Sequence, residues 1–354
     1  MAKIVLENIT HSYNKDVPAV EDVNMVFEDQ TTNALLGPSG CGKTTILKII
    51  CGLLKPTKGK IYFDDEDVTG LPPEKRNVAI VFQFPVVYSM SVYDNLMFPL
   101  LNLKIPQEEK KKKVLEIAEM VGLSHVLNAH APRLGPAEKQ RVAIGRVLIR
   151  EPKVFLFDEP LSSIEPEKKA VLKTEIKKIQ RKLKQTTIYV THDQTEALTF
   201  AEKVAIMDKG RLLQFDTVEN IYNKPAAAFI GFFIGSPGMN IIDGKVKDGS
   251  IDFGDFVFKL PKTMKLPSGL SDVKLGIRPE HVEVSTVEKS GWYKFIVDAY
   301  EPAGKGFGII HISTDHHDIK VRSEQMVDEY TPIWVNFPTQ YIHIFDQNGM
   351  RVNV

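Results

Sequence analysis

The chain has 354 residues, and its 45 lysine and arginine residues balance its 45 aspartate and glutamate residues, so the formal net charge is zero. This length predicts two domains, and the balanced charge argues against nucleic acid as a partner. We expect no membrane span and no secretory leader, since the sequence lacks a run of about 20 apolar residues and an apolar region near its start. The two cysteines, Cys41 and Cys51, are too few for a disulfide scaffold and fit a reducing cytoplasm.

Residues 4 to 27 predict two strands around a polar turn. Apolar residues recur at positions 4, 6 and 9, and then at 20, 23 and 26. Tyr13 lies in the turn between the two strands. An exposed aromatic ring at this place either stacks on a nucleotide base or is an ordinary surface tyrosine.

A glycine-rich stretch at 37–45 follows an apolar run at 34–36 and precedes a helix-like apolar segment at 46–50. Strand, glycine-rich turn and helix are the context of a phosphate-binding loop. Glycines let backbone N–H groups turn toward a triphosphate without Cβ clashes, and the helix N-terminus adds partial positive charge. In this pattern Lys43 meets the β- and γ-phosphates, and the Thr44 hydroxyl ligates Mg²⁺. The sequence therefore predicts a nucleoside triphosphate site made of Gly37, Pro38, Ser39, Gly40, Cys41, Gly42, Lys43, Thr44 and Thr45.

Cys41 lies within this loop, beside the predicted helix N-terminus, where a thiolate is stabilised. We expect its alkylation to block nucleotide binding and Mg-ATP to protect it. The alternative is a buried, inert cysteine.

Residues from about 88 to 150 predict a helical insertion. Before it, the apolar run at 78–82 predicts a buried strand that ends in Gln83. Segments 110–121 and 139–149 have helical periodicity, and prolines and glycines interrupt the pattern between them. The four lysines at 110–113 are interpreted as a solvated helix face rather than a binding patch.

Two further apolar runs end in polar residues. Residues 154–157 lead into Asp158 and Glu159, and residues 187–191 lead into His192. Such runs suit central parallel strands, whose C-terminal ends are where open α/β sheets place ligands. Asp158 is expected to hold Mg²⁺ as a hard oxygen ligand, and Glu159 to polarise a water for attack on the γ-phosphate. A lone histidine after a strand is often structural, but together with the phosphate loop the strand-end groups favour catalytic roles for Gln83, Glu159 and His192.

After a last hairpin signal at 204–210, the pattern changes near residue 236. From there onward, short strands alternate with turns such as 248–249, 267–269 and 346–349, without a convincing helix of normal length. The sequence therefore predicts a nucleotide-binding domain at 1–235 and a small all-β domain at 236–354.

Together these motifs resemble the ATP-binding subunit of an ABC transporter, of the class that drives maltose-type carbohydrate importers. Tyr13 matches the family's adenine-stacking aromatic and residues 37–45 match its Walker A loop. Gln83 matches the Q-loop, residues 156–159 the Walker B strand with its catalytic glutamate, and His192 the switch histidine. In the tail, 235–237, 275–281 and 342–346 look like the accessory β-domain of carbohydrate-import ATPases.

The resemblance implies an α/β fold: a P-loop ABC ATPase domain with a helical subdomain, followed by an all-β, OB-like accessory domain. It implies an ATPase that uses ATP and Mg²⁺, the metal being held by Thr44, Gln83 and Asp158. Two such subunits dimerise head to tail around ATP. They dock on two membrane permease subunits through a surface at 82–100, on the cytoplasmic face of the inner membrane, and an extracytoplasmic solute-binding protein takes part indirectly. The solute expected is a sugar, a polyol such as glycerol, or glycerol phosphate.

One motif departs from the family pattern. The usual Leu-Ser-Gly-Gly-Gln signature, which binds the opposite subunit's nucleotide, corresponds here to Leu134 followed by Gly135, Pro136, Ala137 and Glu138. Gly135 lacks the serine hydroxyl that would bond a γ-phosphate, and Pro136 has no N–H to donate. Glu138 adds a negative charge where a neutral amide is usual. Residues 162–165 also read Ser-Ser-Ile-Glu in place of Ser-Ala-Leu-Asp. We therefore expect a heterodimer with a paralogous ATPase subunit rather than a homodimer with two weakened sites.

Two other functions stay open. One is a soluble ABC ATPase acting in translation or DNA repair, a class that usually carries duplicated cassettes or a long coiled-coil insertion, which this chain lacks. The other is a nonhydrolytic nucleotide sensor, which the altered signature suggests and the presence of Glu159 and His192 argues against.

Overall fold

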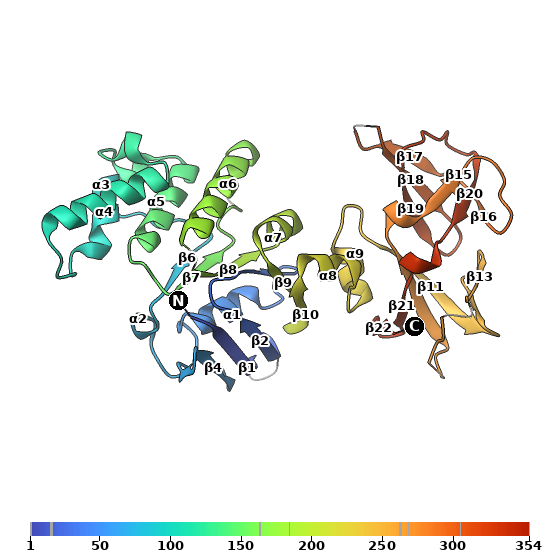
Figure 1. Cartoon of the computed structure of the whole chain (residues 1–354), viewed down its shortest axis with the longest axis horizontal. Coiled ribbons are helices and arrows are strands. Elements are labelled where there is room, and N and C mark those ends of the chain that lie inside the picture. Colours follow the sequence, from blue (N-terminus) through green and yellow to red (C-terminus); the bar gives the residue numbers. More distant parts are fainter. Residues whose placement is uncertain are drawn as a thin grey trace. The chain divides into compact units, whose positions relative to one another are not determined.

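The computed structural model describes residues 2–14, 17–162, 164–183, 185–261, 264–267, 269–304 and 306–353. It divides into two compact units, Met1–Val218 and Glu219–Val354. The first unit combines helices with two sheets, and the second is built mainly of strands (Figure 1). Each unit is described by itself.

The smaller sheet of the first unit is antiparallel, with strand order β2-β1-β4-β5. Its strands are β1 (Ile4–His11), β2 (Val20–Phe27), β4 (Lys58–Phe63) and β5 (Glu66–Asp67). The apolar residue Val26 is exposed in β2, whereas Met25 and Phe27 are buried. The register between β1 and β2 shifts at Ile9↔Val23, and from Val23 onward a strict two-residue period turns Met25 and Phe27 inward.

The larger sheet has the order β10-β9-β3-β8-β7-β6. The five strands β9, β3, β8, β7 and β6 run parallel to one another, and the edge strand β10 pairs antiparallel with β9. The strands are β3 (Thr32–Leu36), β6 (Val78–Val81), β7 (Val154–Asp158), β8 (Thr186–Thr191), β9 (Lys203–Asp208) and β10 (Arg211–Thr217). Every residue of β7 and β8 is buried, as expected for strands covered on both faces.

Two apolar cores cover the two faces of this parallel sheet. One contains Leu156 and Ile188 with helix α1 (Lys43–Ile50) and the antiparallel sheet. The other contains Phe155, Phe157 and Tyr189 together with the helical region. The remaining helices near the sheet are α2 (Pro73–Arg76), α6 (Pro166–Leu183) and α7 (Gln194–Phe200).

The helical region groups together in Figure 1 and spans residues 92–148. Its elements are α3 (Val92–Met97), η1 (Phe98–Leu100), α4 (Gln107–Met120), η2 (Ser124–Val126), η3 (Ala131–Arg133) and α5 (Pro136–Leu148). The lysine run lies on α4 and is solvated only in part. Lys111 and Lys112 are exposed, whereas Lys110 is buried and donates to the Leu101 carbonyl at 3.1 Å, which its long apolar stem permits.

The second unit begins within α8 (Val218–Asn223), at Glu219, and continues with α9 (Ala228–Phe233). Its largest sheet has the order β13-β12-β11-β14-β21-β22, and two three-stranded sheets follow as β15-β20-β16 and β17-β18-β19. The strands are β11 (Asn240–Lys247), β12 (Ser250–Asp252), β13 (Val257–Lys259), β14 (Asp272–Ile277), β15 (Glu283–Ser285), β16 (Tyr293–Ile296), β17 (Ala299–Pro302), β18 (Gly308–Ser313), β19 (Asp318–Ser323), β20 (Pro332–Asn336), β21 (His343–Asp346) and β22 (Arg351–Val352). Single turns of 3₁₀ helix form η4 (Pro279–His281) and η5 (Thr339–Tyr341).

Arg278 ties the two short helices to these strands. Its side chain is 2% exposed and donates hydrogen bonds to the carbonyls of Tyr222, Gly231 and Ile234. The predicted domain boundary at 235 therefore lies inside the second compact unit, because residues 219–234 pack with the β-strands that follow them.

Candidate functional site

The carboxyl ends of four neighbouring parallel strands meet at one edge of the large sheet. The 37–42 loop follows β3, Gln83 lies two residues beyond β6, Asp158 ends β7, and His192 follows β8. Polar residues that are far apart in the sequence are thereby brought to one edge, which is where open α/β sheets bind ligands.

The 37–42 loop has a shape that two of its glycines permit. A Cβ on Gly37 would lie 2.1 Å from the Met207 carbonyl oxygen, so a side chain there would clash with the end of β9. Gly42 has φ +102°, and a Cβ on it would lie 2.6 Å from the Ala19 carbonyl oxygen. Helix α1 begins directly after Gly42, so its first N–H groups point toward the loop.

Lys43 is the first residue of α1, and its residue surface is 5% exposed. Its ammonium donates to the carbonyls of Gly37 at 2.8 Å and Pro38 at 2.9 Å. The loop therefore holds a full positive charge beside the helix N-terminus, which is an arrangement suited to phosphate.

For Cys41 the structure favours the alternative of a buried cysteine over a stabilised thiolate. Its side chain is buried, and burial raises the pKa of the thiol even though the Lys43 ammonium lies nearby and lowers it. The Sγ atom lies 3.7 Å from the Lys43 Nζ. Desolvation outweighs the effect of Lys43 on the pKa, so a slow reaction of the Cys41 thiol is expected.

Thr44 and Asp158 form the hydroxyl–carboxylate pair of the site. The Thr44 hydroxyl donates to Asp158 Oδ1 at 2.9 Å. Burial raises the pKa of Asp158, and the neighbouring Glu159 adds to this rise, while the Thr44 hydrogen bond opposes it. An ionised Asp158 is therefore a desolvated charge that a cation would stabilise.

Glu159 and His192 contact each other. Glu159 Oε2 lies 2.9 Å from His192 Nδ1, and the His192 side chain is 54% exposed. The exposure argues against a structural histidine in the core. Glu159 has φ +48°, a left-handed conformation that is uncommon for a residue with a side chain. Its N–H donates to the Val190 carbonyl at 3.0 Å, which links the turn after β7 to β8.

Tyr13 and Gln83 flank these groups. Tyr13 is 58% exposed, and its hydroxyl lies 3.2 Å from Thr45 Oγ1, next to the phosphate-loop residues. Its ring also packs edge-on against His11, with 4.9 Å between the centroids. Gln83 is half-buried, and its strand pairs with β7 at Val81↔Phe157, so it follows the strand beside Asp158.

The four altered signature residues lie at the N-terminus of α5. Gly135 is the N-cap, and its N–H donates to Glu138 Oε2 at 3.2 Å, while Glu138 Oε1 lies 3.7 Å from His125 Nε2. Glu138 therefore caps its own helix, in a position where an anion is favoured by the helix dipole. Pro136 and Ala137 form the first turn of the helix. In the segment 162–165, Ser162 Oγ donates to the Glu159 carbonyl at 3.0 Å, and Ser163 lies outside the described residues.

Sequence reasoning missed a buried polar network under His192. Glu196 is 3% exposed and accepts hydrogen bonds from Tyr189 and Thr191, both at 2.9 Å. Lys169 of α6 contacts Glu196 at 2.6 Å and Asp193 at 3.1 Å. The signal available in the sequence was the Asp193–Glu196 spacing, which is typical of an N-cap followed by an acidic third residue.

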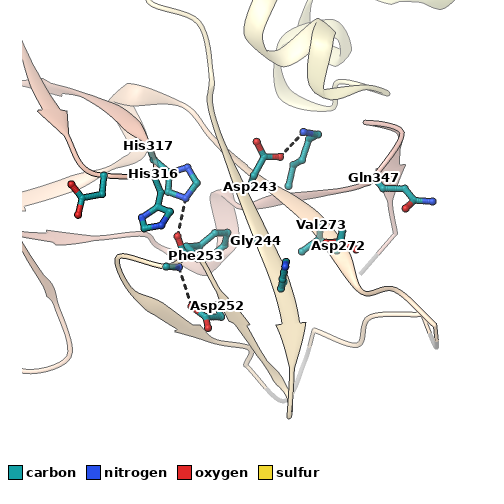
Figure 2. A pocket seen from close by; sticks show the side chains of 13 residues that line it. Asp243, Gly244, Asp252, Phe253, Asp272, Val273, His316, His317 and Gln347 are labelled. Atoms are coloured by element: carbon teal, nitrogen blue, oxygen red, sulfur yellow. Dashed lines mark hydrogen bonds and ion pairs between the residues drawn. The ribbon is translucent and has the colours of Figure 1, made fainter.

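A separate shallow pocket of about 750 Å³ lies on the second unit, lined by carboxylates and two histidines (Figure 2). Several of its polar groups bind each other: His317 Nε2 lies 2.9 Å from the Phe253 carbonyl, and Asp252 accepts from the Gly254 N–H at 2.9 Å. His316 Nδ1 pairs with Asp255 at 3.1 Å. These contacts engage both histidines and one of the carboxylates of the lining within the chain itself.

Comparison with known proteins identifies the family. A family model described as ABC transporter matches residues 20–162, and one described as MalK OB fold domain matches residues 235–282. The chain is 38% identical to the sn-glycerol-3-phosphate import ATP-binding protein UgpC of Psychromonas ingrahamii, over 99% of this chain and 95% of that protein. It is 40% identical to the trehalose/maltose import ATP-binding protein MalK of Thermococcus litoralis, over 94% of each chain. The oligosaccharides import ATP-binding protein MsmX of Bacillus subtilis is 37% identical over 98% of each chain.

Solved structures of ABC ATPases share the fold over part of this chain. CbiO1 of Clostridium perfringens, part of an ABC transporter complex, has a TM-score of 0.58 and 29% identity, covering 62% of this chain and 89% of that one. An ATP-binding cassette solved as a dimer with ADP and Pi has a TM-score of 0.55 and 28% identity, covering 61% of this chain and 98% of that one.

The fold and site thus define an ATP-binding protein of the ABC transporter class. More narrowly, the chain belongs to the import ATP-binding subunits that carry a MalK-type OB-fold domain, and it is an ATPase that drives solute import. Across the residues that the structure describes, none of the helices combines the length and apolarity needed to cross a bilayer.

Proposed function

We propose that this chain hydrolyses ATP at the carboxyl edge of its parallel sheet and thereby energises the import of a sugar, glycerol or glycerol phosphate. The observation that carries this proposal is the contact of Glu159 with His192 at 2.9 Å, next to the Thr44–Asp158 pair at 2.9 Å. The range of solutes rests on the names of the relatives, which are import proteins for glycerol phosphate, trehalose, maltose and oligosaccharides.

The phosphate-loop residues 37–45 bind the triphosphate, and Lys43 places its charge against the β- and γ-phosphates. Glu159 accepts the proton of the attacking water, and His192 holds the Glu159 carboxylate in place through the 2.9 Å contact. Gln83 at the neighbouring strand end positions the water or the metal. Tyr13, being exposed next to the loop, stacks on the adenine.

The donor set fits Mg²⁺. Thr44 and Asp158 supply a hydroxyl and a desolvated carboxylate, which are hard oxygen ligands, and Gln83 supplies an amide oxygen. Among the described residues no group of three or more His, Cys, Asp and Glu side chains forms a metal cage, and Mg²⁺ in triphosphate sites is held by few protein ligands together with phosphate oxygens. When bound, the metal neutralises charge that develops on the phosphates.

The proposed surface for the two permease subunits is an exposed apolar segment that begins after β6. Phe84 and Val86 are 69% and 66% exposed, and Phe82 and Phe98 are also exposed. The backbone of this segment is held from within, because Arg146 donates to the Val86 carbonyl at 2.8 Å and the buried Asn95 bonds both backbone groups of Tyr88. A firmly held segment with exposed aromatic side chains fits a protein partner. This would place the chain peripherally on the cytoplasmic face of the inner membrane.

We further propose that the ATPase pair is a heterodimer with a paralogous subunit. The support is chemical: Gly135 has no hydroxyl, Pro136 no N–H, and Glu138 already accepts the Gly135 N–H. If signatures act on the opposite subunit's nucleotide, these defects harm the partner's site and leave Lys43, Glu159 and His192 of this chain intact. In such a pair, Lys43→Ala in this chain should abolish transport, whereas the equivalent change in the partner should be milder. The reverse asymmetry, or a fully active homodimer, would contradict the heterodimer.

The test of the function as a whole is reconstitution. Co-expression with two permease subunits and the solute-binding protein of the same importer, followed by incorporation into proteoliposomes, should give ATP hydrolysis that rises when solute and solute-binding protein are added. Glycerol phosphate, glycerol, maltose and trehalose are the solutes to compare. Hydrolysis unaffected by permeases or by every solute would contradict the transport function.

A further inference from the structure

Glu196 is a buried carboxylate that needs its neighbours. It lies in the first turn of α7, and its Oε2 accepts from the Tyr189 and Thr191 hydroxyls, both at 2.9 Å. Its other oxygen contacts the Lys169 ammonium at 2.6 Å. A buried carboxylate is tolerated only when it is paired and hydrogen-bonded, so these three partners hold the start of α7 against β8.

Lys169 contacts a second carboxylate as well, that of Asp193 at 3.1 Å. Asp193 is the N-cap of α7 and accepts from the N–H groups of Thr195 and Glu196. Burial alone would raise the pKa of Asp193, but the Lys169 ammonium and these N–H groups outweigh burial and lower it. A single ammonium thus bridges two carboxylates that stand on either side of one helix start.

His192 lies between the residues held by this network. Thr191 precedes it and donates to Glu196, and Thr191 Oγ1 also accepts the Asp193 N–H at 3.0 Å. Asp193 follows it and contacts Lys169. The backbone on both sides of His192 is therefore fixed, whereas its exposed ring has the Glu159 carboxylate as a contact at 2.9 Å.

Lys169 extends this arrangement to another part of the chain. It lies in the first turn of α6, and its N–H donates to the Glu165 carbonyl at 2.9 Å. Residues 162–165 connect this turn to Glu159, since Ser162 Oγ donates to the Glu159 carbonyl at 3.0 Å. The chain thus closes a ring from Glu159 through α6 and Lys169 to the His192 loop and back to Glu159.

We infer that Lys169 is a positioning residue for hydrolysis, because its contacts with Asp193 and Glu196 set the place of His192 against Glu159. The inference rests on the proposed roles of Glu159 and His192. Lys169 has no place in the 37–45 loop, so its loss should misplace the pair without weakening ATP binding. Misplacement of a catalytic group by about 1 Å can cost ~10²-fold in rate.

The test compares Lys169→Met and Lys169→Arg in the assembled transporter, with ATP affinity and thermal midpoint measured beside kcat. Lys177→Met is the matched control, since Lys177 lies two turns further along α6 and bonds a carbonyl of α7, that of Thr199, at 2.8 Å, rather than a carboxylate. We expect Lys169→Met to lower kcat about tenfold or more with the Kd for ATP within twofold. Lys169→Arg should keep kcat within about threefold, and Lys177→Met should match the wild type.

Equal kcat values in Lys169→Met and Lys177→Met would overturn the inference, as would a parallel loss of ATP affinity, thermal midpoint and kcat in both Lys169 variants. If Lys169→Met does not assemble, Asp193→Asn replaces it, because asparagine keeps the N-cap and removes the charge that Lys169 contacts. Wild-type kcat in Asp193→Asn would then overturn the inference. Glu159→Gln in the same assay separates the two claims. If Glu159→Gln still hydrolyses ATP, the proposed catalytic role of Glu159 and His192 is contradicted. If Glu159→Gln is inactive and Lys169→Met is active, only the role of Lys169 is contradicted.

Discussion

The Glu138 carboxylate accepts a hydrogen bond from the Gly135 N–H at 3.2 Å, so the start of α5 already holds an anion of its own chain. A helix N-terminus attracts phosphate through its N–H groups and its dipole. Both attractions are reduced here, because Glu138 uses one N–H and contributes a negative charge, and Pro136 supplies no N–H at all.

Restoring three of the four altered signature residues should therefore activate a transporter that contains only this ATPase subunit. We predict that Gly135→Ser, Pro136→Gly and Glu138→Gln together raise ATP hydrolysis of the transporter assembled without a paralogue by at least tenfold, since one transition-state donor is typically worth ~10² to 10³ in rate. Glu151→Gln is the control, because it removes a different carboxylate, one that pairs with Lys113 at 2.8 Å just beyond the other end of α5. No gain in the triple variant would show that the signature does not limit this protein.

The ionised Asp158 carboxylate should lower the thermal stability of the folded protein when no cation is bound, and a bound cation should reverse this effect. Burial raises the pKa of Asp158 in the folded state. Its stabilising contribution to the folded protein is therefore fully present below the pKa that Asp158 has in the unfolded chain, and it is lost as the pH rises through the pKa of the folded state. At pH 7 we predict that Asp158→Asn raises the thermal midpoint without nucleotide by a few degrees and loses most of the increase that Mg-ATP gives the wild type. Scanning calorimetry with and without Mg-ATP measures both.

Asp67→Asn is a suitable comparison for this effect. The pKa of Asp67 is lowered by hydrogen bonds from Thr69, so its ionised form is favoured in the folded protein and its loss should not raise the midpoint. A midpoint for Asp158→Asn below that of the wild type would contradict a desolvated charge at Asp158.

Cys41 should react slowly with alkylating agents. Burial raises the pKa of its thiol and also that of Cys51, so at pH 7.5 neither forms an exposed thiolate. We predict that iodoacetamide labels both cysteines of the folded protein slowly, and that labelling of Cys41 becomes fast only in denaturant. Mass spectrometry of the labelled peptides measures both rates. Rapid labelling of Cys41 in the folded protein that Mg-ATP suppresses would contradict this prediction and support a reactive Cys41 thiolate.

The strand-end groups could be predicted because each belongs to a short local pattern. Asp158 and His192 stand directly after apolar runs, and parallel strands bring their carboxyl ends to one edge, so no knowledge of packing was needed. The OB-type domain was likewise recognisable from its motifs, and the family match at 235–282 confirms it.

Features that depend on packing between distant segments could not be predicted. Cys41 was placed correctly in the loop, but its burial depends on the residues of the surrounding core, which the loop sequence does not contain. The contact between Lys169 and Glu196 joins helices α6 and α7, and periodicity alone identifies neither partner. Arg278 is similar, since its three carbonyl partners lie in a helical segment more than 40 residues earlier.

The most direct test of the account is the Glu159→Gln variant in the assembled transporter, with ATP binding and steady-state hydrolysis measured on the same sample. The substitution removes the carboxylate that would accept the proton of the attacking water, while Lys43 and the 37–45 loop still hold the nucleotide. We predict ATP affinity within about threefold of the wild type and hydrolysis reduced by ~10² or more. Hydrolysis at the wild-type rate would contradict the account, because catalysis would then not depend on the Glu159–His192 pair.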